Sequence, residues 1–288
     1  RKWDKGDDHA DRIPVIAENG VLMLQNYSTS SREMVSAITQ TPDFSICHAR
    51  LGHPSPSQMR KLAEVVADLP LSKSAWIKAA EENPHCEACE RVENKVYRKR
   101  SISRGYVPVG HTSHIDSAGT ITPTCYMHDK VQATTFYVFV DQHSRFKRVV
   151  LVGSRKDYLN IVKDYVTWTR FKVYTIFVDG GPELVQNSVK SWCREKGIIL
   201  RTSAPGEHDQ HGIAESGVRH IKKLATKLMT DASVPSALWG YGVQFAGYLA
   251  NLQIHTKHGV TPTEKVTGMR PSIGHLKRPF CKVIVNLT

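Results

Sequence analysis

Residues 174–184 read YTIFVDGGPEL, an apolar run that ends on Asp179 and is followed at once by Gly180, Gly181 and Pro182. β-Branched and aromatic residues before a Gly/Pro cluster predict a strand that ends in a sharp turn. Asp-Gly is also an ordinary turn sequence, so this stretch alone does not indicate a function. A functional interpretation needs other carboxylates with the same placement, at the ends of neighbouring elements.

The periodicity on both sides of this run predicts an α/β domain. Strands are expected at 112–119, 134–142, 146–153, 173–179 and 198–203, and helices at 157–170, 187–197, 212–232 and 235–253. Three successive strands followed by alternating helices and strands are typical of a mixed sheet with helices on its faces. We therefore expect a mixed five-stranded sheet flanked by helices.

The 288-residue chain is strongly basic, with a formal net charge of +12 from 39 Lys and Arg against 27 Asp and Glu. An excess of this size is typical of a protein that binds a polyanion, most often nucleic acid. No apolar run reaches membrane-spanning length and no secretory signal is present, so we expect no membrane partner. Six cysteines, with one closely spaced pair, argue against a disulfide framework and predict a reducing compartment.

Composition divides the chain into five expected segments. They are an N-terminal extension (1–43), a small helical domain rich in His and Cys (44–97), a basic linker (98–110), the α/β core (111–255) and a C-terminal extension of the core (256–288). Short strands are expected at 19–27 and 281–287. Because the chain starts with Arg1 rather than Met, we expect it to be part of a longer product.

Four residues of the small helical domain have the types and spacing of zinc ligands. His48 and His53 lie about a helical turn apart, and Cys86 and Cys89 form a Cys-x2-Cys pair. Such a pair lets two thiolates reach one ion, and two nearby histidines can complete a tetrahedron. We therefore expect one structural Zn2+ held by these four side chains.

Two alternatives stay open for this domain. His85, next to Cys86, can substitute as a ligand, and Cys47 is a weaker substitute. The other alternative is that the histidines are surface residues and the cysteines are small core residues.

Asp179 has two counterparts in the core. Asp116 ends the strand expected at 112–119, and Glu215 lies in the first turns of the helix expected at 212–232. Three carboxylates brought together by a sheet repel one another strongly unless cations lie among them. Hard oxygen ligands suit Mg2+ or Mn2+, and two such ions about 4 Å apart can hold the attacking and leaving oxygens of a phosphodiester. These three carboxylates are our candidate catalytic and magnesium-binding residues.

The helix around Glu215 has an apolar stripe on the opposite side. Arg219 and Lys222, at i+4 and i+7, share the face of Glu215. A carboxylate beside two cations is often a solvated pair on a helix surface. In a polynucleotide-binding enzyme, the same face would bind metal through Glu215 and DNA phosphates through Arg219 and Lys222.

Taken together, these residues resemble the integrases of Ty1/copia-type long-terminal-repeat retrotransposons and, through them, retroviral integrases. The order of the candidate residues matches, and 35 residues separate Asp179 from Glu215. Further matching stretches run from the zinc residues to the C-terminus: HARLGHPS (48–55), FVDQHSR (139–145), DGGPEL (179–184), SAPGEHDQHGIAE (203–215), VPSALWGYGV (234–243) and TPTEKVTGMRPSIGHLK (261–277).

The resemblance implies an RNase H-like core, with Asp116 on the first strand, Asp179 beyond the fourth and Glu215 on a following helix. It also implies an N-terminal HHCC zinc-binding domain of the GAG-pre-integrase kind. The implied activity is that of a metal-dependent polynucleotidyl transferase, which joins the 3′ ends of element DNA to target DNA. Two Mg2+ or Mn2+ ions would serve the active site and one Zn2+ the structural site. Trimming of the 3′ ends by an accompanying endonuclease activity is left open.

The resemblance also implies partners and a place of action. The chain would work as a homo-oligomer on the element's terminal DNA and the target DNA, and would be released from a Pol polyprotein. It would assemble in a cytoplasmic virus-like particle and act in the nucleus. The expected DNA contacts are Arg219, Lys222, Gln210 and His211 and, in the basic linker, Arg98, Lys99 and Arg100.

Other functions stay open. The chain differs from the family pattern at Gly180 and His211, where Asn is usual, so a catalytically decayed integrase-like nucleic-acid-binding protein is the main alternative. A ribonuclease H would need an additional Glu on its first helix, where this chain has only Asp157 and Asp164. An aspartic protease would need Gly in place of Ala118 after Asp-Ser.

Overall fold

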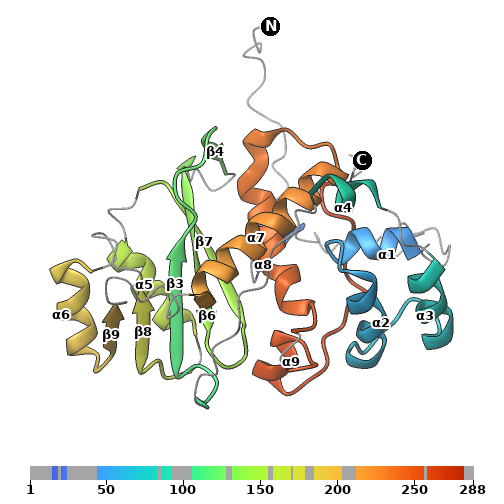
Figure 1. The fold of residues 1–288 in the computed structure, drawn as a ribbon. Helices are drawn as coiled ribbons and strands as arrows, with labels where there is room; N and C mark the ends of the chain where they lie inside the picture. The colour runs from blue at the N-terminus through green and yellow to red at the C-terminus, as the bar shows by residue number, and fades with distance from the viewer. Residues whose placement is uncertain are drawn as a thin grey trace, which may run out of the picture.

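The computed structural model describes residues 15–18, 21–24, 44–82, 86–92, 106–127, 132–154, 158–169, 171–178, 185–202, 212–255 and 258–281. The central sheet has helices on both faces, and helices α1–α4 lie beyond α7 and α8, on the right of the view (Figure 1).

The central sheet is mixed and has five strands, as the sequence predicts. Its members are β3 (Thr112–Ser117), β6 (Thr135–Asp141), β7 (Lys147–Val152), β8 (Thr175–Val178) and β9 (Ile199–Thr202), in the order β7-β6-β3-β8-β9. β6 pairs antiparallel with both β3 and β7, whereas β8 is parallel to β3 and β9 to β8. This is the arrangement expected of an RNase H-like core.

The side chains of the strands alternate between two hydrophobic clusters, one on each face of the sheet. On one face, Ile115 and Tyr137 pack with α5 (Tyr158–Trp168) and α6 (Asn187–Glu195). On the other face, Val138 and Val140 pack with α7 (Gly212–Asp231) and α8 (Trp239–Leu252). Every residue of β6 is buried, because both of its faces are covered.

A glycine lets α7 lie close to the sheet. A Cβ atom at Gly217 would come within 2.7 Å of Val140 Cγ2 and 3.5 Å of Val138 Cγ1. Real Cβ contacts essentially never reach the shorter distance, so the helix axis could not lie this near to β6 with a larger residue. The position of α7 above the sheet therefore depends on the absence of a side chain at one residue.

Four short helices make up the N-terminal part: α1 (Phe44–Arg50), α2 (Pro56–Val65), α3 (Lys73–Glu82) and α4 (Glu87–Val92). Ser55 and Gln58 form a capping box at the start of α2, which satisfies two backbone N–H groups there. Trp76 of α3 is fully buried, and its indole N–H donates to the carbonyl of Met59 at 2.6 Å. Apolar residues of α1, α2 and α3 belong to the same hydrophobic cluster as those of α7 and α8.

The C-terminal segment contacts the N-terminal helices. After α9 (Pro262–Thr267), the carboxylate of Asp68 accepts hydrogen bonds from the hydroxyl of Ser272 and the backbone N–H groups of Ile273 and Gly274, at 2.6–2.8 Å. Burial opposes ionisation of Asp68, but these hydrogen bonds outweigh it and lower the pKa of the carboxyl. The carboxylate of Asp68 thus joins two segments of the chain that are about 200 residues apart.

Some elements differ from expectation. The helix predicted to begin at Pro235 opens with a 3-10 turn, η3 (Ser236–Leu238), before α8 begins at Trp239. The strand expected at 19–27 is observed as β2 (Val21–Leu24), which pairs antiparallel with an unpredicted strand, β1 (Val15–Glu18). A second small hairpin, β4 (Cys125–Tyr126) with β5 (Gln132–Ala133), is too short to give a periodic signal. The strand expected at 281–287 lies almost wholly outside the described residues.

In the described part of the chain, no helix has the length and apolar character needed to cross a membrane.

Substitution of Gly217 tests the close approach of α7. We expect Gly217→Ala to lower the free energy of unfolding by about 1–3 kcal/mol, because the added methyl collides with Val140 and outweighs the gain in helix propensity. Gly212→Ala is the control, since a Cβ at this first residue of α7 meets no atom within 4 Å. Denaturant unfolding measures both, and a Gly217→Ala protein as stable as the wild type would contradict this packing.

Candidate metal centre and active-site face

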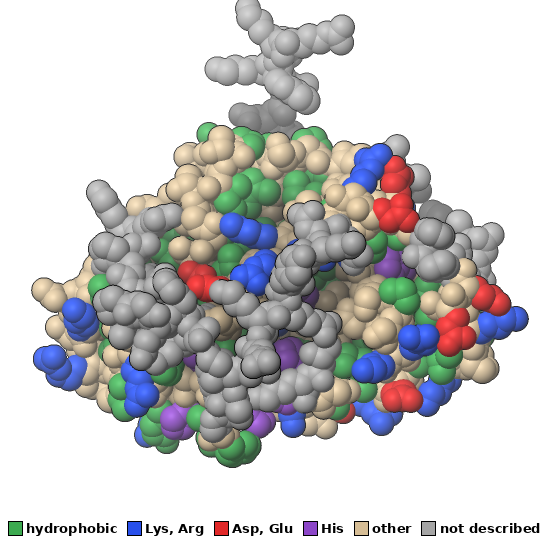
Figure 2. All heavy atoms as spheres, in the orientation of Figure 1, with side chains coloured by type: hydrophobic (Ala, Val, Ile, Leu, Met, Phe, Trp, Pro, Cys, Tyr) green, Lys and Arg blue, Asp and Glu red, His purple; other side chains and the backbone are tan. Residues whose placement is uncertain are grey.

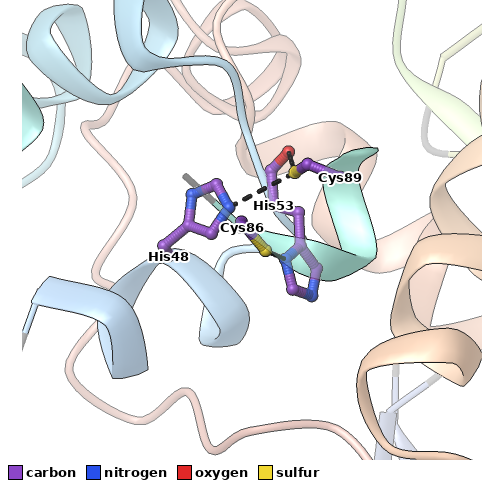
Figure 3. A group of neighbouring side chains, drawn as sticks. All are labelled: His48, His53, Cys86 and Cys89. Carbon is purple, nitrogen blue, oxygen red and sulfur yellow. Dashed lines mark hydrogen bonds between the residues drawn. The ribbon is translucent and has the colours of Figure 1, made fainter. Parts of the chain in front are cut away.

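The four predicted zinc ligands come together at one point. His48 lies in the last turn of α1, His53 follows that helix, Cys86 precedes α4, and Cys89 lies within it. Their ligand atoms all lie within 4.8 Å of one another, and Figure 3 shows the four side chains pointing toward one another. In the part of the chain that the structure describes, this is the only His/Cys/Asp/Glu group with the geometry to hold a metal ion.

The turn after α1 brings the second histidine back toward the first. Gly52 and His53 have φ values of +75° and +57°, and the His53 N–H donates to the carbonyl of His48 at 2.9 Å. Glycine is required at position 52 for a second reason, because a Cβ there would lie 2.8 Å from Leu224 Cδ1 of α7. The left-handed conformation of His53 is uncommon for a residue with a side chain, and the turn that requires it brings the imidazole back toward His48.

Each cysteine faces one histidine. Cys86 Sγ lies 3.4 Å from His53 Nδ1, and Cys89 Sγ lies 3.4 Å from His48 Nε2. Burial lowers the pKa of both imidazoles to about 4, so both are neutral at pH 7 and have a lone pair to offer a metal. Two imidazole nitrogens and two sulfurs that all lie within 4.8 Å of one another fit a closed tetrahedral Zn2+ site.

Cys89 would release a proton when it binds a metal. Burial raises the pKa of the Cys89 thiol, although the nearby Lys227 ammonium acts in the opposite direction. Without metal the thiol form is therefore favoured at neutral pH, and metal binding becomes stronger as the pH rises. A cavity of about 310 Å³ is lined by all four of the predicted zinc ligands.

Two residues beside the cluster were not anticipated from the sequence. Lys227 and Asp231, both on α7, contact Cys89 and His53 respectively. The one available signal was a lysine in the buried stripe of an amphipathic helix, where an apolar residue is expected. Of the two substitutes considered for the site, Cys47 is buried in the hydrophobic cluster outside this metal-binding group, and His85 lies outside the described residues.

Asp116 and Glu215 lie on the same side of the sheet. Asp116 is half-buried on β3 opposite Val138 of β6, one of the two residues against which α7 packs. Its Oδ1 accepts a hydrogen bond from the N–H of Ser117 at 2.7 Å. Glu215 is exposed in the first turn of α7, two residues before Gly217.

Asp179 lies outside the described residues. The strand that leads to it is described, and it ends at Val178, which is the partner of Ile115 on the parallel strand β3. Ile115 and Val178 each directly precede a predicted catalytic aspartate in the sequence. The register is described up to this pair of residues, and the position of Asp179 beside Asp116 stays a prediction.

The predicted DNA contacts are described only in part. Arg219 is exposed, and so is Lys222, whose Nζ donates to the carbonyl of Ala118 at 2.6 Å. Gln210, His211, Arg98, Lys99 and Arg100 lie outside the described residues. Lys and Arg side chains are spread across the face shown in Figure 2, while Asp and Glu side chains lie mostly on its right, over the N-terminal helices.

Asp141, in the stretch FVDQHSR, has a structural role, because it holds the turn that follows β6. Its carboxylate accepts hydrogen bonds from the N–H of Gly110 and from both the N–H and the hydroxyl of Ser144, at 2.7–2.8 Å. These contacts fix the turn between β6 and β7 and join it to the start of β3. The carboxylate is buried at the end of the sheet opposite to Asp116.

Comparison with known proteins finds similar sequences for most of the chain. Residues 20–92 match the family described as the GAG-pre-integrase domain. The chain is 25% identical over 240 residues to the retrovirus-related Pol polyprotein from transposon RE1 of Arabidopsis thaliana, and 25% identical over 268 residues to that from transposon RE2. These findings support a Ty1/copia-type integrase. The alignments cover 80% and 87% of this chain but only 15% and 17% of the two polyproteins.

Solved structures of integrase catalytic cores also match the chain. The core of BIV integrase is 17% identical, with a TM-score of 0.41, over 55% of this chain and 95% of that one. The HTLV-2 integrase core, solved in complex with magnesium in a trimeric form, is 22% identical, with a TM-score of 0.42, over 57% and 99%.

Removal of the metal ligands tests the zinc prediction. We expect the wild-type chain to bind one Zn2+ and a chelator to lower its Tm by about 10 °C or more, because site formation is coupled to folding. Cys86→Ser and Cys89→Ser should abolish tight binding, whereas Cys193→Ala on α6 should keep it. Elemental analysis of dialysed protein and thermal unfolding measure these effects. Zinc retained by both serine variants would contradict the assignment.

Proposed function

We propose that the chain catalyses metal-dependent strand transfer, in which 3′ ends of retrotransposon DNA are joined to target DNA. Support comes from the common face of Asp116 and Glu215, the strand register that leads to Asp179, and the similarity to Pol polyproteins. The register carries most weight, because it pairs Ile115 with Val178, the two residues that directly precede Asp116 and Asp179 in the sequence.

In this reaction a 3′-hydroxyl attacks a phosphodiester of the target strand. A new bond forms between the attacking oxygen and phosphorus, the bond to the target's own 3′ oxygen breaks, and that oxygen leaves with a proton. Mg2+ or Mn2+ bound to the carboxylates would supply charge neutralisation and activation of the hydroxyl. The donor chemistry fits, since carboxylate oxygens are the ligands these ions prefer.

The remaining proposed roles follow from exposure and charge. Glu215, in the first turn of α7, lies where the helix dipole favours a carboxylate. Arg219, exposed one turn later, would contact a DNA phosphate. Lys222 would act differently, because its bond to the Ala118 carbonyl fixes the segment that follows Asp116. The same proposal includes a homo-oligomer bound to DNA and action in the nucleus, and it leaves trimming of the 3′ ends open.

A second candidate is an integrase-like protein that binds DNA without catalysis. The unusual residues Gly180 and His211 favour it, and the net charge of +12 would serve either function. The carboxylates favour the enzyme, because a protein that only binds a polyanion gains nothing from Asp116 and Glu215 on one face.

A strand-transfer assay distinguishes the two candidates. The chain is incubated with a labelled duplex that carries the element's terminal sequence, a target plasmid and Mn2+ or Mg2+. We expect joined product with the wild type and a loss of at least about a hundredfold with Glu215→Gln or Asp116→Asn. Glu195→Gln, an exposed glutamate on α6, should leave the yield unchanged.

Binding of the labelled duplex at increasing salt concentration completes the test. Salt-sensitive binding without joined product, in a chain extended to include its neighbouring polyprotein segments, would favour the decayed protein. Equal product from the wild type and Glu215→Gln would contradict the assigned active site.

A further inference from the structure

We infer that Lys227 and Asp231 of α7 form the outer shell of the predicted zinc site, so that zinc binding joins the N-terminal helices to the helix that carries Glu215. The inference rests on the zinc site and is independent of strand transfer. Both residues contact predicted ligands across more than 130 positions of sequence, and both belong to a single helix.

Lys227 contacts the site through its ammonium group. The Nζ atom donates to Cys89 Sγ and to the carbonyl of His53, both at 3.3 Å. The residue is only 7% exposed, and no carboxylate of the described residues lies within ion-pair distance of it. A buried ammonium needs a compensating partner, and the thiolate of a metal-bound Cys89 provides one. Lys227 would in turn stabilise the charge on that sulfur.

Asp231 contacts the site through the outer nitrogen of a histidine. His53 presents Nδ1 to Cys86 and Nε2 to Asp231, whose Oδ2 lies 3.6 Å away. An imidazole that binds metal through one nitrogen usually directs its other N–H to a carboxylate or carbonyl, which fixes its tautomer and orientation. Asp231 has the position of such a carboxylate, with Nδ1 as the metal ligand.

The position of Asp231 in its helix supports this role. It is the last residue of α7, where a carboxylate opposes the helix dipole. Arg278 offsets part of this cost, because its Nε donates to Asp231 Oδ2 at 2.8 Å. The arginine also holds the carboxylate in place beside His53. A carboxylate that is unfavourable for the helix itself therefore lies in contact with a predicted metal ligand.

The contacts of Lys227 and Asp231 extend the stabilising effect of the metal from the N-terminal helices to α7. Lys227 and Asp231 are one turn apart, and Lys227 lies 12 residues after Glu215, about 18 Å along the helix axis. Leu224, one turn before Lys227, packs against Gly52, which directly precedes His53 in the turn after α1. Zinc binding therefore stabilises the second half of the same helix whose first turn carries the predicted catalytic glutamate.

Zinc affinity of single variants tests the inference. The zinc dissociation constant is measured by competition with a chromophoric chelator for the wild type, Lys227→Met, Asp231→Asn and the control Lys223→Met. We expect the first two substitutions to weaken binding by about 10- to 100-fold, as is typical of outer-shell partners, and the control to have no effect. The Co2+-substituted proteins should keep the absorption of two thiolate ligands, because His48, His53, Cys86 and Cys89 are unchanged.

Clear outcomes would overturn the inference. They are an unchanged zinc affinity in both Lys227→Met and Asp231→Asn, or a wild-type chain that binds no zinc. If Lys227→Met fails to fold at saturating zinc, Asp231→Asn alone decides, since its carboxylate lies at the end of the helix and loses only a charge. No DNA is present in these measurements, so their failure is distinguishable from failure of the proposed strand transfer.

Discussion

The structure depends on the close packing of α7 between the central sheet and the N-terminal helices. On one side Gly217 allows the helix to touch Val138 and Val140, and on the other Leu224 meets Gly52 beside the predicted zinc ligands. Because interiors are close-packed, a displacement of α7 would disturb both surfaces at once. Apolar residues of α1, α2 and α3 accordingly belong to the same hydrophobic cluster as those of α7, α8 and the face of the sheet that these two helices cover.

The two predicted metal sites lie toward opposite ends of this helix and differ in chemistry. Near its C-terminal end, sulfur and imidazole donors are partly buried and close together, which suits a structural ion without an open position. At its N-terminal end, the carboxylate of Glu215 is exposed, which suits hydrated hard cations and a polyanionic substrate. The strong positive charge of the chain complements such a substrate and makes its binding sensitive to salt.

Local sequence patterns predicted much of the fold and less of the site's surroundings. The apolar run TTFYVFVDQ (134–142) predicted the strand β6, whose seven residues are all buried in the structure, and the spacing of the His and Cys residues predicted which side chains would gather. The contacts of Lys227 and Asp231 could not be predicted, because they join residues far apart in sequence and only the packing of α7 brings them together. The same holds for the hydrogen bond from Gly110 to Asp141, which joins residues 31 positions apart, whereas the two bonds from Ser144 to Asp141 are local. Asp116 and Glu215 lie on one face, and their catalytic role stays a prediction.

The measurement that tests the shared role of α7 most directly is hydrogen exchange of the wild-type chain with and without zinc. The account predicts that zinc slows exchange in residues 224–231 of α7 as well as around the ligands in α1 and α4. A zinc effect confined to residues 44–92, with α7 unchanged, would show that the metal stabilises only the N-terminal helices, and would contradict the account.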